Sequence, residues 1–430
     1  MKHGEPLEID PAKHNPVGKR WLGGVQPRDA AWLLAVSTML FVLLMPFSSY
    51  VAALPLIQDE WDLNNTQAGV IFSAYLLGFA VSALFVLPLT DRFGSKVILV
   101  SFASISVVSH ILFPLFADNL VTAVVLRVLA GVGLVGVYNP GMRIVAERFS
   151  NHGRGMAIGT YVTFFYASNS VSLALTGILM SYMKWRDAYM IMALLAAISI
   201  PMAYMLLRTH KVPVSGSSGT LDLSVLKNRA TRIFILGYSL HAAELYIVRV
   251  WLPAFLVAVL VARGAGSAEA AVTAATVGGI ALATGAAGPV IGGILSDRWG
   301  RAVSASAIFA LSGAVSFVIG WLIGFPWPVV VGLTAIYGWA IAADSAIYST
   351  AVTEVSEPSK LGSTLAVHSF LGFMGGVIGP IVVGGILDLS PESIKWGLAF
   401  SVTGALSIVA ILSLMTVRNS ARPSRAGKSG

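Results

Sequence analysis

The chain of 430 residues contains no cysteine, and only 11% of its residues are charged. The absence of cysteine excludes disulfides, thiol catalysis and cysteine-ligated metal sites. The scarcity of charge excludes a soluble surface, because soluble globular domains carry about 25% charged residues. A cytosolic enzyme, a nucleic-acid-binding protein and a disordered chain are therefore poor matches for this composition.

Long apolar runs make up most of the chain, since 56% of its residues are hydrophobic and the mean hydropathy is +0.80. A membrane helix needs about 20 predominantly apolar residues to cross the hydrocarbon core of a bilayer. Twelve stretches are that long, and none alternates as a membrane strand would. We predict helices that span the lipid bilayer at about 31–54, 66–89, 97–116, 120–142, 156–181, 188–207, 233–259, 271–295, 302–323, 329–352, 362–387 and 395–416.

Lysine and arginine are distributed unevenly between the loops. Of the 28 such residues, 22 lie before the first span, after the last, or in every second loop. Because positively charged loops stay in the cytoplasm, we expect both termini there. No apolar stretch of the signal-peptide type precedes the first span. The pattern predicts a multi-pass protein of the cell (inner or plasma) membrane. The lysines and arginines of these loops and tails explain the high isoelectric point of the chain.

A polar linker and an internal repeat divide the chain into two halves. Residues 208–231 have the Pro-, Gly- and Ser-rich composition of a linker between basic flanks. The loops after the second and eighth spans share a motif at an offset of 206 residues. We expect a cytoplasmic tail, a six-helix bundle, a cytoplasmic linker, a second six-helix bundle and a second cytoplasmic tail at 1–29, 30–208, 209–231, 232–418 and 419–430.

The repeated loops resemble the loop signature of the major facilitator superfamily. They read Leu89-x-Asp91-Arg92-x-Gly94-x-Lys96 and Gly293-x-Leu295-x-Asp297-Arg298-x-Gly300-Arg301. In the first copy Leu87 replaces the usual glycine and Ser95 a basic residue. The resemblance implies an all-α membrane protein of twelve helices in two pseudo-symmetric bundles that transports by alternating access. It also implies that both motifs, from Asp91 to Lys96 and from Asp297 to Arg301, form a gate on the cytoplasmic side.

Four charged side chains fall inside predicted spans: Arg127, Glu244, Arg249 and Asp344. Such residues usually face a bundle interior or a watery cavity. Helical spacing lets His241 and Glu244 touch, and we expect Arg249 and Asp344 to attract each other. We also expect Pro253 to kink or break its helix. Arg127 could equally be a brace between helices instead of a substrate ligand. Either Arg249 or Asp344 could likewise belong to a structural ion pair that does not touch the substrate.

The resemblance implies that the first, fourth, seventh and tenth helices line a central cavity. The predicted substrate and coupling residues are Arg127, Tyr138, Asn139, Asn169, His241, Glu244, Arg249 and Asp344. Guanidinium groups bind carboxylates in a bidentate way, and buried carboxyl groups carry protons. The first hypothesis is therefore proton-linked uptake of a small organic or inorganic anion, and the run from His241 to Phe255 is similar to cyanate- and nitrate-type porters.

Two other classes of function remain open. The first is efflux of drugs or metabolites by proton antiport, although the helix at 156–181 lacks the proline that drug antiporters carry. The second is a transporter-like sensor or scaffold, which would need a larger soluble domain than the tails or the linker supply. We expect no enzymatic activity, no cofactor, no metal site and no nucleic-acid partner. The expected partners are a small-molecule solute, protons and lipid, and we expect the protein to be a monomer.

Overall fold

The computed structural model describes residues 26–93, 95–149, 154–207, 222–357 and 360–418. Helices dominate these residues, and no strand occurs among them. Eleven helical segments of the described chain are long and apolar enough to cross a membrane. The predicted all-α membrane fold is confirmed.

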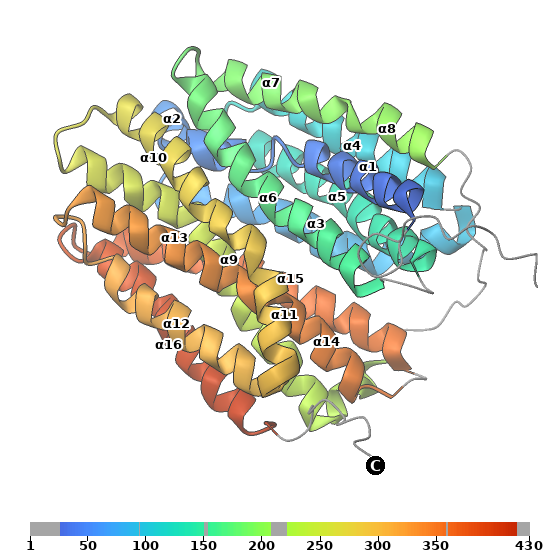
Figure 1. Cartoon of the computed structure of the whole chain (residues 1–430). Helices are drawn as coiled ribbons and strands as arrows, with labels where there is room; N and C mark the ends of the chain where they lie inside the picture. The colour runs from blue at the N-terminus through green and yellow to red at the C-terminus, as the bar shows by residue number, and fades with distance from the viewer. Residues whose placement is uncertain (1–25, 94, 150–153, 208–221, 358–359, 419–430) are drawn as a thin grey trace, which may run out of the picture.

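The helices form two groups that follow the order of the chain (Figure 1). The first half contains α1 (Pro27–Leu43), α2 (Ser49–Trp61), α3 (Asn65–Phe93), α4 (Ser95–Phe116), α5 (Leu120–Arg148), α6 (Arg154–Met180), α7 (Trp185–Ala197) and α8 (Ser199–Leu206). The second half contains η2 (Leu223–Lys227), α9 (Arg229–Val261), α10 (Ser267–Leu282), η3 (Ala283–Ala287), α11 (Gly288–Trp299), α12 (Arg301–Ile319), α13 (Trp327–Ala343), α14 (Ser345–Val355), α15 (Leu361–Leu389) and α16 (Lys395–Met415).

Several predicted spans are interrupted in the structure. The span at 31–54 is two helices, α1 and α2, joined by turns around Pro46. The span at 271–295 is α10, a short 3₁₀ turn and α11, and the span at 329–352 is α13 and α14, which meet at Asp344. Pro253 was expected to kink or break its helix; a break is wrong, because α9 continues through it to Val261, and the kink stays a prediction. Proline is tolerated inside membrane helices where neighbouring groups satisfy the freed backbone.

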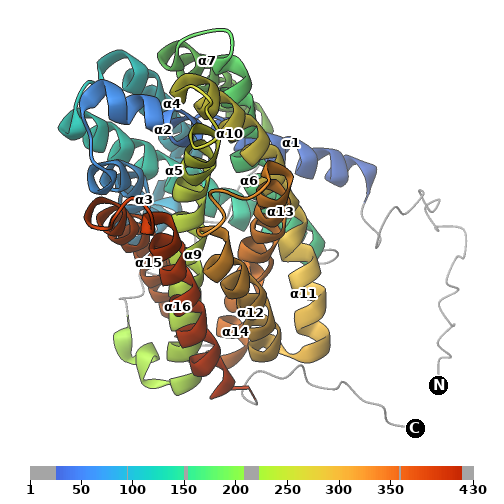
Figure 2. The ribbon, with the colours of Figure 1, turned by 90° about the vertical axis from the view of Figure 1, so that its left-hand side faces the viewer.

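Two pairs of helices hold the halves together. Along their length α3 packs against α15, and α6 packs against α10 (Figure 2). Glycine allows both approaches: a Cβ at Gly69 would lie 2.7 Å from the Pro380 carbonyl oxygen, and one at Gly279 would lie 2.5 Å from the Ala174 nitrogen. Small residues of this kind permit close packing of membrane helices. The interface between the halves therefore runs along two glycine-lined contacts.

The bundle has two ends, which we name from the chain. At the terminal face α1 begins and α16 ends, and at the far face α2 is followed by α3. On the far-face side α10 packs along α6, whereas its continuation α11 hardly touches α6. Also at the far face, the Asp388 carboxylate of α15 accepts hydrogen bonds from the backbone nitrogens of Asn65 and Thr66 at 2.9 and 2.8 Å. The halves are thus joined more tightly at the far face than at the terminal face.

Candidate functional site

A small cavity lies between the two halves where the interrupted spans meet. Its wall includes Ser48 from the break between α1 and α2, Gly285 from η3, and Ala342 near the end of α13. The remaining lining residues are Tyr166, Asn169, Ser170, Leu173, Leu245, Arg249, Leu282, Gly338 and Ile341. The cavity volume is about 30 Å³, enough for a water molecule but far below the volume of a ligand pocket. The structure therefore has this site almost closed.

The break between α1 and α2 is stabilised by α6. The Ser172 hydroxyl donates to the Met45 carbonyl and accepts a hydrogen bond from the Ser48 nitrogen at 3.1 Å. One turn further along, the Ser49 and Thr176 hydroxyls lie 2.8 Å apart. Unwound backbone at membrane depth needs such partners, because no water is available to it in the hydrocarbon. Side chains of α6 thus supply the hydrogen bonds that the missing turn of helix would have made.

Arg249 of α9 places its guanidinium at the cavity among aromatic rings. The ring centroids of Phe165, Tyr166 and Tyr246 lie 5.7, 5.1 and 5.4 Å from it. Its Nη1 donates to the Asn169 Oδ1 at 3.4 Å. Within the described residues no carboxylate forms an ion pair with Arg249. The attraction expected between Arg249 and Asp344, because both helices were expected at the cavity, is therefore not an ion pair in this structure. The cavity consequently contains a cation that has no counter-ion among the described residues.

Three other predicted site residues lie near Arg249, but at different distances from the cavity. Asn169 lines the cavity, is 5% exposed, and donates to the Phe165 carbonyl at 2.6 Å. Tyr138 of α5 does not line it, but its ring lies 5.1 Å from the Phe165 ring. Asn139 is half-buried beside Tyr138. Of these three, only Asn169 both lines the cavity and contacts Arg249.

His241 and Asp344 form a buried pair. The His241 Nδ1 lies 2.8 Å from the Asp344 Oδ1, and each side chain is 2% exposed. The Tyr348 hydroxyl donates to the other oxygen of Asp344 at 2.8 Å. Tyr238 stacks between His241 and His368, with centroids 5.9 and 4.1 Å away. The partner of Asp344 is therefore a histidine of α9 and not Arg249.

Glu244 lies one turn from His241 but belongs to a separate network. Its carboxylate accepts hydrogen bonds from the Ser312 hydroxyl at 3.1 Å and from the Tyr337 hydroxyl at 3.3 Å. The network continues from Tyr337 to Ser316 and Thr403. The expected contact between His241 and Glu244 is replaced by these partners from α12, α13 and α16. None of them lines the cavity.

Arg127 of α5 is 0% exposed and lies in a cage of aromatic rings. Its guanidinium is 5.7, 5.2 and 4.8 Å from the centroids of Phe47, Tyr50 and Tyr75. One nitrogen, Nη1, donates to the Phe47 carbonyl at 3.5 Å. In the described chain the other two, Nε and Nη2, have no hydrogen-bond partner. Because Ser48 follows Phe47 and lines the cavity, Arg127 lies directly behind the cavity wall.

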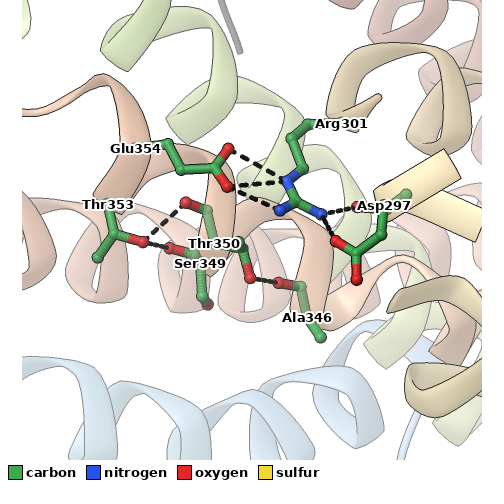
Figure 3. A network of polar contacts seen from close by, with 8 residues as sticks. Asp297, Arg301, Ala346, Ser349, Thr350, Thr353 and Glu354 are labelled. Atoms are coloured by element: carbon green, nitrogen blue, oxygen red, sulfur yellow. Dashed lines mark hydrogen bonds and ion pairs between the residues drawn. The ribbon is translucent and has the colours of Figure 1, made fainter. Parts of the chain in front are cut away.

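At the terminal face the second loop motif forms an ion-pair network (Figure 3). Arg301 contacts Asp297 at 2.6 Å and Glu354 of α14 at 2.7 Å. Gly300 has φ of +89°, a conformation that favours glycine, and Arg298, two residues before it, is exposed. All these contacts lie within the second half. Among the described residues the network therefore does not bridge the halves.

The first loop motif is described only in part. Gly94 and the side chains of Asp91 and Arg92 lie outside the described residues. The Lys96 Nζ lies 4.1 Å from the centroid of the Tyr204 ring, which belongs to the same half. The gating role of both motifs remains a prediction.

Sequence reasoning missed the hydroxyl groups around the cavity. Tyr166 lines it, and its hydroxyl lies 2.5 Å from the Ser345 Oγ of the other half. Ser48 and Ser172 mark the break in the first span. Serine and tyrosine are common in membrane helices as ordinary packing residues, so only the nearby Pro46 could have pointed to the break.

Comparison with known proteins identifies relatives along the whole chain. The family model of the Major Facilitator Superfamily matches residues 36–325 and 234–430. A gallate transporter of Pseudomonas putida is 24% identical, over 92% of this chain and 94% of that protein. A hexuronate transporter of Bacillus subtilis is 22% identical, over 86% and 89% of the two chains. A 4-hydroxybenzoate transporter of Acinetobacter baylyi is 26% identical over 31% of this chain and 32% of its own length.

Solved structures agree with the fold. The crystal structure of the nucleoside transporter NupG has a TM-score of 0.70 at 14% identity, covering 90% of this chain and 99% of that one. A bacterial homologue of the human lysosomal transporter Spinster, in an inward-facing and occupied conformation, has a TM-score of 0.67 at 16% identity, covering 91% and 97%. At these identities the likeness concerns the fold alone. None of the relatives named here supports the resemblance to cyanate and nitrate porters.

Proposed function

The chain belongs to the major facilitator superfamily, a family of transporters, and on that premise we propose that it takes up a small organic carboxylate together with protons. One observation carries the proposal: Arg249 lies at the cavity without a carboxylate partner in the described chain. A guanidinium binds a carboxylate through two parallel hydrogen bonds. The relatives named for gallate, hexuronate and 4-hydroxybenzoate support an organic acid, because all three solutes carry a carboxylate.

The rest of the cavity wall favours a substrate with an apolar body. Arg249, Asn169 and Tyr166 supply its polar groups, whereas Leu173, Leu245, Leu282 and Ile341 are apolar. A monocarboxylate with a hydrocarbon or aromatic body would leave few of its own polar groups without a partner there. A sugar acid would leave more. We therefore place aromatic carboxylates first among the candidate substrates.

The His241–Asp344 pair is the proposed proton site. Both side chains are buried, and the His241 Nδ1 and the Asp344 Oδ1 lie 2.8 Å apart. We assign both termini to the cytoplasm of a monomer in the cell membrane, following the distribution of lysine and arginine. Glu357→Cys and Ser267→Cys should then be labelled by an impermeant thiol reagent from opposite sides, and labelling of both from one side would refute this topology.

Transport by the purified protein in liposomes tests the proposal. The panel contains benzoate, 4-hydroxybenzoate, gallate, glucuronate, nitrate, cyanate and a lipophilic cation, each under an imposed pH gradient. We expect carboxylate-dependent proton entry in the wild type. In Arg249→Gln we expect carboxylate affinity to fall by about tenfold or more, because a charge-assisted contact is lost. Arg28→Gln, which changes an exposed arginine, is the matched control.

The other outcomes of the panel would overturn the proposal. Proton exchange with the lipophilic cation alone would identify an efflux antiporter. Transport restricted to nitrate or cyanate would identify an inorganic-anion porter. Arg249→Gln with the same carboxylate affinity as Arg28→Gln would remove Arg249 from the site.

A further inference from the structure

Asp344 and Ser345 are consecutive residues that contact opposite halves of the protein. They lie at the junction of α13 and α14, where the Ile347 nitrogen bonds the Asp344 carbonyl in a tight turn at 2.9 Å. The Asp344 carboxylate contacts His241 and Tyr348 of its own half. The Ser345 hydroxyl contacts the Tyr166 hydroxyl of the first half at 2.5 Å. One peptide bond, between Asp344 and Ser345, and one hydrogen bond, between Ser345 and Tyr166, therefore connect the proposed proton site to a side chain of the substrate cavity.

The direction of the hydrogen bond at this junction follows from the number of protons available. A serine hydroxyl has one proton to donate. Ser345 donates to the Ala342 carbonyl at 2.7 Å. Tyr166 must then donate its own single proton to Ser345. The Tyr166 hydroxyl is thus already engaged when the cavity is empty.

A carboxylate bound at Arg249 would compete for that same proton. The Tyr166 ring lies 5.1 Å from the Arg249 guanidinium, and both residues line the cavity. A carboxylate oxygen accepts an O–H donor more strongly than a neutral hydroxyl does. The Tyr166 hydroxyl can therefore serve Ser345 or the substrate, but not both at once. Substrate binding would release Ser345 and with it the junction that holds Asp344.

We propose that the Asp344–Ser345 junction couples substrate to proton, through a Tyr166 hydroxyl that bonds either Ser345 or the substrate carboxylate. The inference rests on the proposed function and names the element that links its two sites. A change at one site alters affinity at the other by the same factor, because coupling between two ligands is reciprocal. The ionisable and hydroxyl groups that surround the His241–Asp344 pair are Tyr166, Tyr238, Glu244, Tyr348 and His368.

The pH dependence of substrate affinity tests the coupling. The dissociation constant of gallate, or of another carboxylate selected by the liposome panel, is measured at about pH 5.5 and about pH 8. We expect the two values to differ by about tenfold in the wild type, and to become nearly equal in Ser345→Ala and in Tyr166→Phe. Ser345→Thr, which keeps the hydroxyl, should restore the difference. The control is Ser401→Ala, since that hydroxyl donates to the Gly397 carbonyl of its own helix.

Two results would refute the coupling while leaving the proposed function intact. One is a wild-type pH dependence that persists in both Ser345→Ala and Tyr166→Phe. The other is a wild type that binds its carboxylate equally at both pH values. If no carboxylate binds the wild type at all, the proposed function fails and the coupling fails with it. Thermal unfolding of each variant establishes that it is folded. If Ser345→Ala is not folded, Tyr166→Phe alone tests the coupling.

Discussion

Arg127 and Arg249 are both surrounded by aromatic rings, but only Arg249 lines the cavity. Arg127 is fully buried, and in the described chain two of its nitrogens have no partner. A buried cation of this kind lowers stability unless something compensates for its lost hydration. A brace between helices would be expected to have all its donors satisfied. Three aromatic rings around the guanidinium compensate part of the lost hydration, so Arg127 either braces these helices or gains a further contact in another state of the transport cycle, and both roles stay predictions.

Replacing Arg127 separates the two explanations. We expect Arg127→Met to keep or raise the midpoint of thermal unfolding, because an apolar side chain of similar length suits the ring cage. Substrate affinity should fall by about tenfold, the effect of losing one charge-assisted contact. Arg28→Met is the control, measured by the same unfolding and binding assays. Marked destabilisation with unchanged affinity would instead make Arg127 a brace.

Sequence reasoning identified most charged residues of the site but not their partners. A charge inside an apolar run is conspicuous, so Arg249, Asp344 and Glu244 could be found without a structure. Which charges meet depends on the distances between helices, and helical periodicity does not supply them. Asp344 consequently pairs with His241 rather than Arg249. Tyr166 could not be singled out, because its role depends on Ser345 of the other half.

At the scale of elements, the broken spans build the cavity. The break between α1 and α2 relies on Ser172, whose hydroxyl serves both the Met45 carbonyl and the Ser48 nitrogen. Both groups belong to the backbone, so they stay buried and need a hydrogen-bond partner whatever the side chains around them do. A single serine thus satisfies two buried backbone groups.

We expect Ser172→Ala to destabilise the protein by about 1–3 kcal/mol, since it leaves buried polar groups without partners. The measurement is thermal unfolding of the purified protein. Ser401→Ala is again a suitable control, because its hydroxyl bonds a carbonyl that already belongs to a helix. Equal unfolding midpoints for the two variants would show that the break does not need Ser172.

Hydropathy predicted where the spans lie but not where they break. Apolar runs of about 20 residues are sufficient to locate a membrane helix. A break expected at Pro253 does not occur. The break that does occur, at Asp344, could not be predicted, because the chain contains neither proline nor glycine there. Breaks depend on whether neighbouring helices can satisfy the freed backbone groups. That information lies in the packing and not in the local sequence.

For the whole molecule, the contact between α3 and α15 closes the far face. In addition to its two backbone contacts, Asp388 accepts hydrogen bonds from the Asn65 Nδ2 at 2.8 Å and the Thr66 Oγ1 at 2.6 Å. A carboxylate at a helix N-terminus is favoured by the helix dipole. Because Asp388 belongs to one half and Asn65 to the other, these contacts must break for the far face to open.

We expect Asp388→Asn to open the far face more often. The native chain has no cysteine, so Ser48→Cys provides a single reporter at the cavity. Labelling from the far-face side by an impermeant thiol reagent should be about tenfold faster when Asp388→Asn is added, since charge-assisted contacts are weakened. Glu392→Gln is the control, because Glu392 pairs with Lys395 of the same half. Equal labelling rates in both backgrounds would contradict the prediction.

The near-closure of the cavity has a consequence for inhibition. In this structure the halves are contracted around a space of only about 30 Å³ beside Arg249. A bulkier carboxylate could still reach Arg249 from an open face, yet its size would prevent that contraction. Such a molecule would occupy the site without crossing the membrane. Enlarging the apolar end of a substrate should therefore turn it into a competitive blocker, with the carboxylate supplying affinity and the added bulk preventing passage.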